Sequence, residues 1–508
     1  MPPLPYLLCL SLLILACALT FHIVQKERWA LLLLLLGGFC LYFYSASLFP
    51  FLNLWDERFH ALVAKNLLEH PLKPTMYNEK FSAFTPENWS QYYVWLHKQP
   101  LFIWQMAIAF KFFGLNETAM RLPNVVLCTA MIYAAYRSGY LLGNKNVAFY
   151  SAFITVTASY VMKLISGRFP SDQNDAAFLA YCTLSIWSWI EYEHSHKKRW
   201  LILIGVFSGA AILCKWLAGL LVYAAWGVSS LLTNKTSISK YKNMLLAAGL
   251  TAAVALPWQL YCIIVYPNEA RAAYDLNTRH FSEAVDGHTG SYLYHFERMT
   301  ELFGSCVPYL ILPAFAVMLI RVTNKKLGAS LLIAVVFVYA FFTLAVTKMP
   351  SFTVIAMLPV FLAIGFLLDS IFDQRKIRIH PILFFIVFCA IALTRTEFRS
   401  LSENGTFSGT YDNDANYRKI LGHNKDVLSN LKLPDGAIIF NNSHFIETMF
   451  YSDHTAFLRI PSEELYKEVK NMRRPIVVFT HGVQEKDQMP SYITDDAQVI
   501  FMQDPCFD

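Results

Sequence analysis

The chain has 508 residues, of which 56% are hydrophobic and 15% are charged, and its formal net charge is +6. This composition excludes an ordinary soluble domain and indicates a membrane protein with many spans. The basic residues fall in short clusters between apolar runs, which argues against nucleic-acid binding.

Apolar runs recur along the chain at lengths close to the roughly 20 residues that a helix needs to cross a bilayer. The first run follows no basic residue and a second run comes soon after it, so we predict a retained span and not a cleaved signal. Lys215 interrupts one short pair, which leaves the count at 12 or 13. The twelve predicted spans are 5–24, 29–51, 119–143, 146–166, 175–193, 200–214, 216–232, 243–265, 303–321, 328–347, 352–372 and 379–397.

Basic residues gather in every second connection between these runs. Because cytoplasmic connections carry the excess of Lys and Arg, the other connections are predicted to face outward. The outward set includes the long segment 52–118, and the same alternation puts the N-terminus and the tail after residue 398 outside. The basic connections contain Lys26 and Arg28, Lys145, the HKKR run at 196–199, Lys235 to Lys242, Arg321 to Lys326, and Arg375 to Arg378.

The outer segment opens with the acidic pair Asp56 and Glu57 in LWDERFHALVAKNLLEH. Apolar residues recur behind the pair at helical spacing, which predicts an amphipathic helix at the membrane surface with the pair at its N-terminus. Negative charge is favoured at that end of a helix, so one interpretation is a simple cap. The other is a carboxylate presented to a substrate whose tail lies in the lipid.

A second surface helix is predicted from HKQPLFIWQMAIAFKFFG, which is too short to cross the membrane and has Pro100 at its start. Charged side chains near or inside spans cost free energy, although any single long side chain could extend into the lipid head-group layer without a further role. Several cations from distant parts of the chain share one predicted depth with the acidic pair, and together they predict a site for an anionic ligand. These cations are Lys98, Arg168, Lys215 and Lys348.

Other polar residues occur on the same predicted face. Asp172 and Asp175 follow Arg168 in the stretch GRFPSDQND. We predict that they hold the Arg168 side chain or start the next span, and a second acidic site is the alternative. His280 and His288 lack metal-like spacing and are predicted to be loop histidines or sugar contacts. We predict no metal site, and a divalent cation stays open as a cofactor.

The tail after residue 397 becomes polar and contains GAIIFN, TAFLRI and RPIVVFT, with helical stretches such as SEELYKEVKNM between them. Strands that alternate with helices predict a small α/β domain with a partly parallel sheet. The predicted architecture is a polytopic α-helical membrane domain, 1–397, followed by an extracytoplasmic α/β domain, 398–508. Neither part contains a glycine-rich phosphate loop.

These parts fit one reaction. A carboxylate accepts a proton from an attacking hydroxyl or amine, and cations in a low-dielectric site stabilise charge on a departing phosphate. We therefore predict transfer of a sugar from a polyprenyl-phosphate donor to a lipid, glycan or protein acceptor of the cell envelope. Phosphate is already a good leaving group, so one base suffices and one displacement inverts the anomeric centre, whereas glycoside hydrolysis needs two carboxyls.

Several motifs occur in a specific order: the DE pair after an early span, KQPLFIW, FGLNETAMRLP, GRFPSDQNDA, LCKWLAGLL, ALPWQLY, GHTGSYLYH and TKMPSF. In this order they resemble the GT-C class of lipid-linked glycosyltransferases, and within it the bacterial aminoarabinose transferases and protein O-mannosyltransferases (glycosyltransferase families 39 and 83). The resemblance covers about the first 370 residues. It implies the GT-C fold, with about 12 transmembrane helices, in a bacterial inner membrane.

The resemblance also implies roles for residues. Asp56 corresponds to the catalytic carboxylate with Glu57 beside it, and Lys98 to a contact of the donor phosphate. Further donor contacts by resemblance are Lys348, Arg168 and Lys215. Candidate sugar or acceptor contacts are His60, His97, Asp172, Asp175, His280 and His288. The departures are an additional N-terminal span, Gln99 for the usual proline, His97 for a glutamate and Phe352 for a tyrosine, and they predict a different sugar or acceptor within the class.

Two other functions compete with the enzyme. A transporter or flippase of a lipid-linked or anionic solute also fits many spans with charges, but transporters usually show internal repeats and midplane sites, which this sequence lacks. A scaffold of an envelope glycan machine would dock through the tail domain and would tolerate loss of the Asp56 carboxylate.

Overall fold

A computed structural model describes residues 4–167, 173–231, 238–372, 380–396, 415–482 and 485–506. By its internal contacts the chain divides into two compact units. Unit 1 comprises Met1–Leu48, Lys98–Phe102 and Arg121–Ser402, and unit 2 comprises Phe49–His97, Ile103–Met120 and Glu403–Asp508. Most of the outer segment 52–118 therefore groups with the C-terminal tail.

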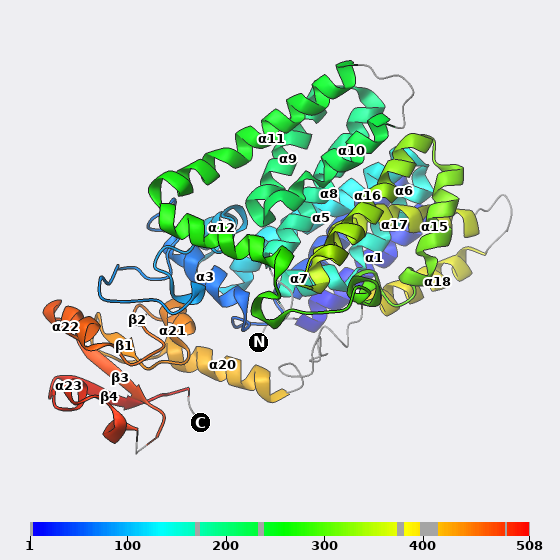
Figure 1. The fold of residues 1–508 in the computed structure, drawn as a ribbon. Coiled ribbons are helices and arrows are strands. Elements are labelled where there is room, and N and C mark those ends of the chain that lie inside the picture. Colours follow the sequence, from blue (N-terminus) through cyan, green and yellow to red (C-terminus); the bar gives the residue numbers. More distant parts are fainter. Residues whose placement is uncertain are drawn as a thin grey trace. The chain divides into compact units, whose positions relative to one another are not determined.

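The regular elements in the described residues of unit 1 are all helices (Figure 1). The α-helices are α1 (Leu4–Ile23), α2 (Glu27–Ala46), α5 (Glu117–Leu142), α6 (Lys145–Val156), α7 (Ser159–Ser166), α8 (Gln173–Ser195), α9 (Lys198–Lys215), α10 (Leu221–Leu231), α11 (Ile238–Val265), α12 (Pro267–Ser282), α13 (Tyr294–Glu297), α14 (Met299–Phe303), α15 (Val307–Arg321), α16 (Lys325–Leu344), α17 (Met357–Ile371) and α18 (Pro381–Thr396). Short 3₁₀ helices are η2 (Trp216–Leu220), η3 (Val285–Gly287) and η4 (Pro350–Ala356).

Within the described ranges, seven segments are long and apolar enough to cross a membrane, or nine if two bent helix pairs each form one span. The polytopic α-helical architecture is confirmed, but the count of twelve is not. The difference arises in three places: α8 carries Asp175, Glu191 and Glu193, α18 has only 16 residues, and α9 to α10 forms one apolar stretch of 34 residues.

The packing of α9 against α11 depends on two glycines (Figure 1). A Cβ atom at Gly205 would lie 2.5 Å from the Cβ of Leu250, and one at Gly209 would lie 2.6 Å from the Cβ of Val254. The Thr251 hydroxyl donates to the Gly205 carbonyl at 3.2 Å. Small residues allow this close approach of backbones, which supplies packing energy where the surrounding lipid is as apolar as the helices.

Unit 2 combines helices with one parallel sheet. Its helices are α3 (Asp56–Asn66), η1 (Trp89–Gln91), most of α4 (Leu101–Phe113), α20 (Ala415–Ser429), α21 (Phe445–Tyr451), α22 (Glu463–Asn471), η5 (Lys486–Gln488) and α23 (Ser491–Thr494). The strands are β1 (Ile438–Phe440), β2 (Thr455–Ala456), β3 (Ile476–Thr480) and β4 (Val499–Gln503), in the order β2-β1-β3-β4 with all neighbours parallel. The three predicted strands and the helix between the last two are present, whereas β4 was not predicted.

The outer segment packs on this sheet through aromatic rings. The Phe457 ring, just after β2, stacks on Phe440 of β1 and on Tyr77, with ring centroids 5.1 Å apart in both pairs. The Arg474 guanidinium, just before β3, donates to the Glu79 carboxylate at 2.6 Å. Segment 76–84 and the sheet thus share one core, which explains why they group in one unit.

Helix α3 is largely buried, which differs from the predicted helix at the membrane surface. Its apolar residues Phe59, Leu62 and Val63 are buried. On its other side the Lys65 ammonium donates to three carbonyls at the end of α21, and Arg58 forms an ion pair of 2.9 Å with Glu447 of α21. The apolar face that predicted contact with lipid is therefore covered by protein, and α21 holds α3 in place.

Candidate active site

The acidic pair begins α3, and the two carboxylates have different surroundings. Glu57 is 3% exposed, and it accepts hydrogen bonds from the backbone and side-chain nitrogens of Asn53 at 3.1 and 3.2 Å. Asp56 is the first helical residue and is half-buried. Trp55 before it has a φ of 81°, a conformation that costs a residue with a side chain about 1–3 kcal/mol. Glu57 braces the loop, so Asp56 is the better candidate for a base.

The two candidate histidines of unit 2 lie in an aromatic cluster. His97 stacks on Trp89 with ring centroids 4.1 Å apart and planes 10° apart. His60 is fully buried, and its ring centroid lies 5.9 Å from that of Trp95. Their surroundings indicate that both rings pack within this cluster, and their predicted contact with sugar or acceptor stays a prediction.

Unit 1 contains a cavity of about 340 Å³, within the usual size range of small-molecule sites. Lys98 and Lys215 line it, and we call it the lysine pocket. Its walls come from the segment before α4, the start of α8, the turn between α9 and η2, helix α12, the end of α16, and η4. Apolar rings form much of the wall, among them Phe281, Phe341, Phe342 and Phe352.

Lys215 reaches this pocket from a sharply turned piece of chain. Its ammonium is bonded to the buried carboxylate of Asp175 and lies 4.9 Å from the centre of the Phe352 ring. Trp216 directly after it has a φ of 59°. A Cβ at Gly219 would lie 2.8 Å from the backbone nitrogen of Ile212, so η2 folds back tightly on α9. These contacts fix the position of the Lys215 ammonium.

A chain of hydrogen bonds holds the segment that carries Lys98. The side-chain oxygen of Gln99 accepts from Gln259 of α11 at 2.7 Å, and Gln259 accepts from the Tyr274 hydroxyl of α12 at 2.8 Å. Gln99 stands where the resembling family usually has a proline. In place of a rigid proline ring, the Gln99 side chain is linked by these hydrogen bonds to α11 and α12.

Helix α12 was missed in the sequence, where 266–302 was treated as an outer connection. Tyr274, Asn277, Thr278 and Phe281 line the pocket from one face of α12, at the spacing that predicts such a face. His280 also lines it. Burial and the positive charges of Lys98 and Lys215 lower the pKa of His280 to about 4, so its imidazole is neutral at pH 7.

Among the other predicted donor and sugar contacts, the structure describes Lys348 but not Arg168 or Asp172. The Lys348 backbone N–H donates to the His288 carbonyl at 3.1 Å, and its ammonium donates to the carbonyls of Phe342 and Thr343 at 3.0 and 2.6 Å. Lys348 thus closes the end of α16 and does not line the described lysine pocket, although the adjacent Met349 does. Its contact with the donor stays a prediction. Arg168 and Asp172 lie outside the described residues.

The structure also bears on the role predicted for Asp175 and on the question of a metal. Asp175 pairs with Lys215. Over the described parts of the chain, no three His, Cys, Asp or Glu side chains come together as a metal site. The residues present in the lysine pocket suit an anion better than a cation.

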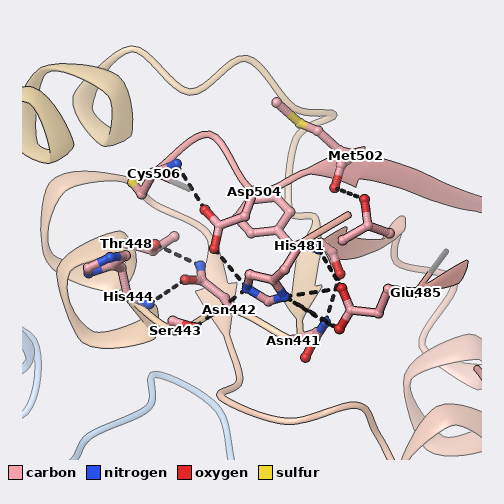
Figure 2. A network of polar contacts seen from close by, with 12 residues as sticks. Asn441, Asn442, Ser443, His444, Thr448, His481, Glu485, Met502, Asp504 and Cys506 are labelled. Atoms are coloured by element: carbon pink, nitrogen blue, oxygen red, sulfur yellow. Dashed lines mark hydrogen bonds and ion pairs between the residues drawn. The ribbon is translucent and has the colours of Figure 1, made fainter. Parts of the chain in front are cut away.

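A separate polar network lies at the carboxyl edge of the sheet in unit 2 (Figure 2). The ring of His481 lies between two carboxylates, with Nε2 3.2 Å from Asp504 and Nδ1 3.3 Å from Glu485. The Asn441 side chain donates to Glu485 at 3.0 Å. Ser443 Oγ lies 3.5 Å from the same Nε2, but an imidazole with a carboxylate at each nitrogen is a poor base for a serine. We interpret the network as a brace between the loops that follow β1, β3 and β4.

Part of the chain matches known proteins in sequence. Residues 97–261 match the family model described as dolichyl-phosphate-mannose-protein mannosyltransferase. An uncharacterised protein of Aquifex aeolicus is 30% identical over 202 residues, which cover 38% of this chain and 36% of that protein. The undecaprenyl phosphate-alpha-4-amino-4-deoxy-L-arabinose arabinosyl transferase 1 of Pseudomonas fluorescens is 24% identical over 283 residues, which cover 54% of this chain and 48% of that protein.

Structural similarity covers more of the chain than sequence similarity does. The crystal structure of ArnT from Cupriavidus metallidurans bound to undecaprenyl phosphate is similar with a TM-score of 0.63 and 14% identity, over 87% of this chain and 88% of that one. The chain therefore has the GT-C fold, and its predicted resemblance to the GT-C class of lipid-linked glycosyltransferases is confirmed. The matches span less than half the length of the two curated relatives. The family match includes Lys98, Asp175 and Lys215.

Proposed function

We propose that this protein is a membrane glycosyltransferase that moves a sugar from a polyprenyl-phosphate donor to an acceptor of the cell envelope on the outer face of the membrane. The observation that carries the proposal is the lysine pocket, which combines two lysines with an apolar wall. An anion with a hydrocarbon tail fits such a pocket. The acceptor is a lipid, a glycan or a protein side chain.

Lys98 and Lys215 bind the donor phosphate in this proposal. Their charges stabilise the negative charge that grows on the phosphate as the sugar leaves, and the surrounding aromatic wall makes that stabilisation stronger than in water. Asp175 holds the Lys215 ammonium ready for this role. Arg168 and Lys348 are proposed as further donor contacts by resemblance.

Asp56 acts as the base. It takes the proton from the acceptor hydroxyl or amine as that group attacks the anomeric carbon, while the bond from that carbon to the phosphate oxygen breaks. The single displacement inverts the anomeric centre. Glu57 keeps the loop in shape through Asn53 and transfers no proton. His280, which is neutral at pH 7, can both donate and accept hydrogen bonds with sugar hydroxyls.

Sugar transfer by the purified full-length protein tests the proposal, with undecaprenyl-phosphate-linked sugars as donors and release of undecaprenyl phosphate as the readout. Asp56→Asn should lower kcat by about 10²- to 10⁴-fold, the usual contribution of a general base, with an unchanged melting temperature. Lys98→Ala and Lys215→Ala should raise the KM for the donor. Glu69→Gln, at an exposed acid of the same segment, is the matched control and should keep full activity.

Two results would overturn the proposal. Full transfer activity in Asp56→Asn would remove the base from the mechanism. Uptake of a lipid-linked or anionic solute into reconstituted vesicles, with no release of undecaprenyl phosphate from any donor, would favour a transporter instead.

A further inference from the structure

Unit 1 contains a second cavity of about 540 Å³, and each lining residue described for it is polar. We call it the polar pocket. It shares no lining residue with the lysine pocket. Lining residues that are all polar, among those the structure describes, are unusual in a chain that is 56% hydrophobic, so the pocket suits a polar occupant. The residues used below are Glu193, His196, Ser229, Ser230, Lys325 and Lys326.

The two pockets lie at opposite ends of the same helices. The polar pocket lies where α16 begins with Lys325 and just before α9 begins, at His196. The lysine pocket lies where α9 ends with Lys215 and near the end of α16, at Phe341. With a rise of about 1.5 Å per residue, these helices are about 27 and 30 Å long, close to the thickness of the hydrocarbon layer. The pockets therefore face opposite sides of the membrane.

Charge assigns the polar pocket to the cytoplasmic side. Lys197, Lys198 and Arg199 follow its lining residue His196, and Lys325 and Lys326 line it directly. Such clusters at the ends of spans mark cytoplasmic connections.

The lining suits a phosphate group. The Lys325 ammonium is held by the carbonyls of Leu319 and Ile320, so one charge is fixed at the rim. Lys326 lies in the first turn of α16, where the helix dipole adds positive potential. The Ser229 side chain lines the same wall, and Ser230 beside it donates its hydroxyl to the Trp226 carbonyl at 3.0 Å. Glu193 suits a hydroxyl donor, such as the head-group glycerol of a phosphatidylglycerol.

Apolar neighbours indicate that the phosphate belongs to a lipid. Leu231 follows the two serines and is 74% exposed, and Ile320 at the end of α15 is 75% exposed. Both belong to helix ends that border the pocket, and both offer surface to acyl chains. We infer that the polar pocket binds the head group of an anionic phospholipid, a phosphatidylglycerol, from the cytoplasmic leaflet.

Native mass spectrometry of the full-length protein in detergent tests this inference, with phosphatidylglycerol, phosphatidylcholine, glycerol 1-phosphate and inorganic phosphate as probes. Phosphatidylglycerol should bind more tightly than phosphatidylcholine. Lys326→Ala should weaken its binding about fivefold, the effect of about 1 kcal/mol for one basic residue near an anionic lipid, and Lys326→Glu should weaken it further. Lys26→Ala removes an exposed lysine from the same predicted face, outside the pocket, and should change little.

Several outcomes would overturn the inference. Equal binding of phosphatidylglycerol and phosphatidylcholine would exclude a charge-selective site. Equal losses in the Lys326 and Lys26 variants would indicate general attraction to the surface. Competition by glycerol 1-phosphate or inorganic phosphate at similar concentration would indicate a soluble ligand. Binding of an undecaprenyl-phosphate donor should stay unchanged in Lys326→Ala, which separates this site from the lysine pocket.

Discussion

Replacing Lys65 by methionine tests how the helix that carries Asp56 is held. The Lys65 ammonium donates three hydrogen bonds to carbonyls at the end of α21, at 2.8 Å to Met449, 3.0 Å to Phe450 and 3.0 Å to Ser452. A methionine keeps the unbranched side chain and its packing but has no donor. The three carbonyls then lose their shared partner.

The expected cost follows from these contacts. Hydrogen bonds to charged groups contribute about 1.5–3 kcal/mol each, but one ammonium shares its three bonds and water can reach the freed carbonyls, so we expect a total of about 3 kcal/mol. The ion pair of Lys65 with the fully exposed Asp453 adds nothing to this sum. Because about 1.4 kcal/mol corresponds to a factor of ten, local opening of α21 should become on the order of 100 times more frequent.

Hydrogen exchange of the peptide that covers 445–452 measures this opening. In Lys65→Met, its amides should exchange on the order of 100 times faster than in the unchanged protein. Lys111→Met, at an exposed lysine of α4, should change exchange less than about threefold. Because α3 carries Asp56, Lys65→Met should also lower kcat, whereas the KM for the donor should change less. Exchange in Lys65→Met that matches Lys111→Met would refute the role assigned to Lys65.

Three further predictions concern the pocket and the sheet edge. Gly219→Val should push η2 off α9 and raise the KM for the donor, whereas Gly227→Val, which meets no atom within 4 Å, should not; equal KM values in steady-state assays would contradict this. The pKa of His280 falls from 6.5 to about 4, so the unfolded chain binds more protons between these values and stability should rise with pH there; His280→Gln should flatten that rise in melting temperatures. Desolvation acts to raise the pKa of Glu485, but hydrogen bonds from His481 and Asn441 lower it overall, so its stabilisation should be complete above about pH 4.5 and be lost as pH falls further; Glu485→Gln should remove that acid-sensitive part.

Features set by local sequence were predicted well. The three strands β1, β2 and β3 appear where apolar and β-branched residues cluster between turn signals, and the helix α22 follows the serine of SEELYKEVKNM, whose hydroxyl caps it at Leu465. The membrane helices also coincide with the apolar runs. The length and the periodicity of one segment are enough to predict such an element, without knowledge of its contacts.

Features set by contacts between distant segments were not predicted. The sequence pattern of α3 fits an interfacial helix, because it shows an apolar face but not that other protein segments bury that face. Asp175 is forty residues from Lys215, and nothing in either motif indicates that they pair. Helix α12 was passed over because its polar and aromatic pocket face is too mixed to read as a span.

The lysine pocket and the start of α3 share a feature that bears on the proposed chemistry. A tryptophan with positive φ stands next to each candidate group, Trp55 before Asp56 and Trp216 after Lys215. Such a backbone costs about 1–3 kcal/mol at a residue with a side chain and persists only where the surroundings enforce it. In one unit Asn53 and Glu57 bond to each other across Trp55, and in the other Asp175 holds Lys215 while η2 folds tightly onto α9 at Gly219. Both candidate groups are therefore held before any substrate binds, so little of the binding energy of a donor is spent on arranging them.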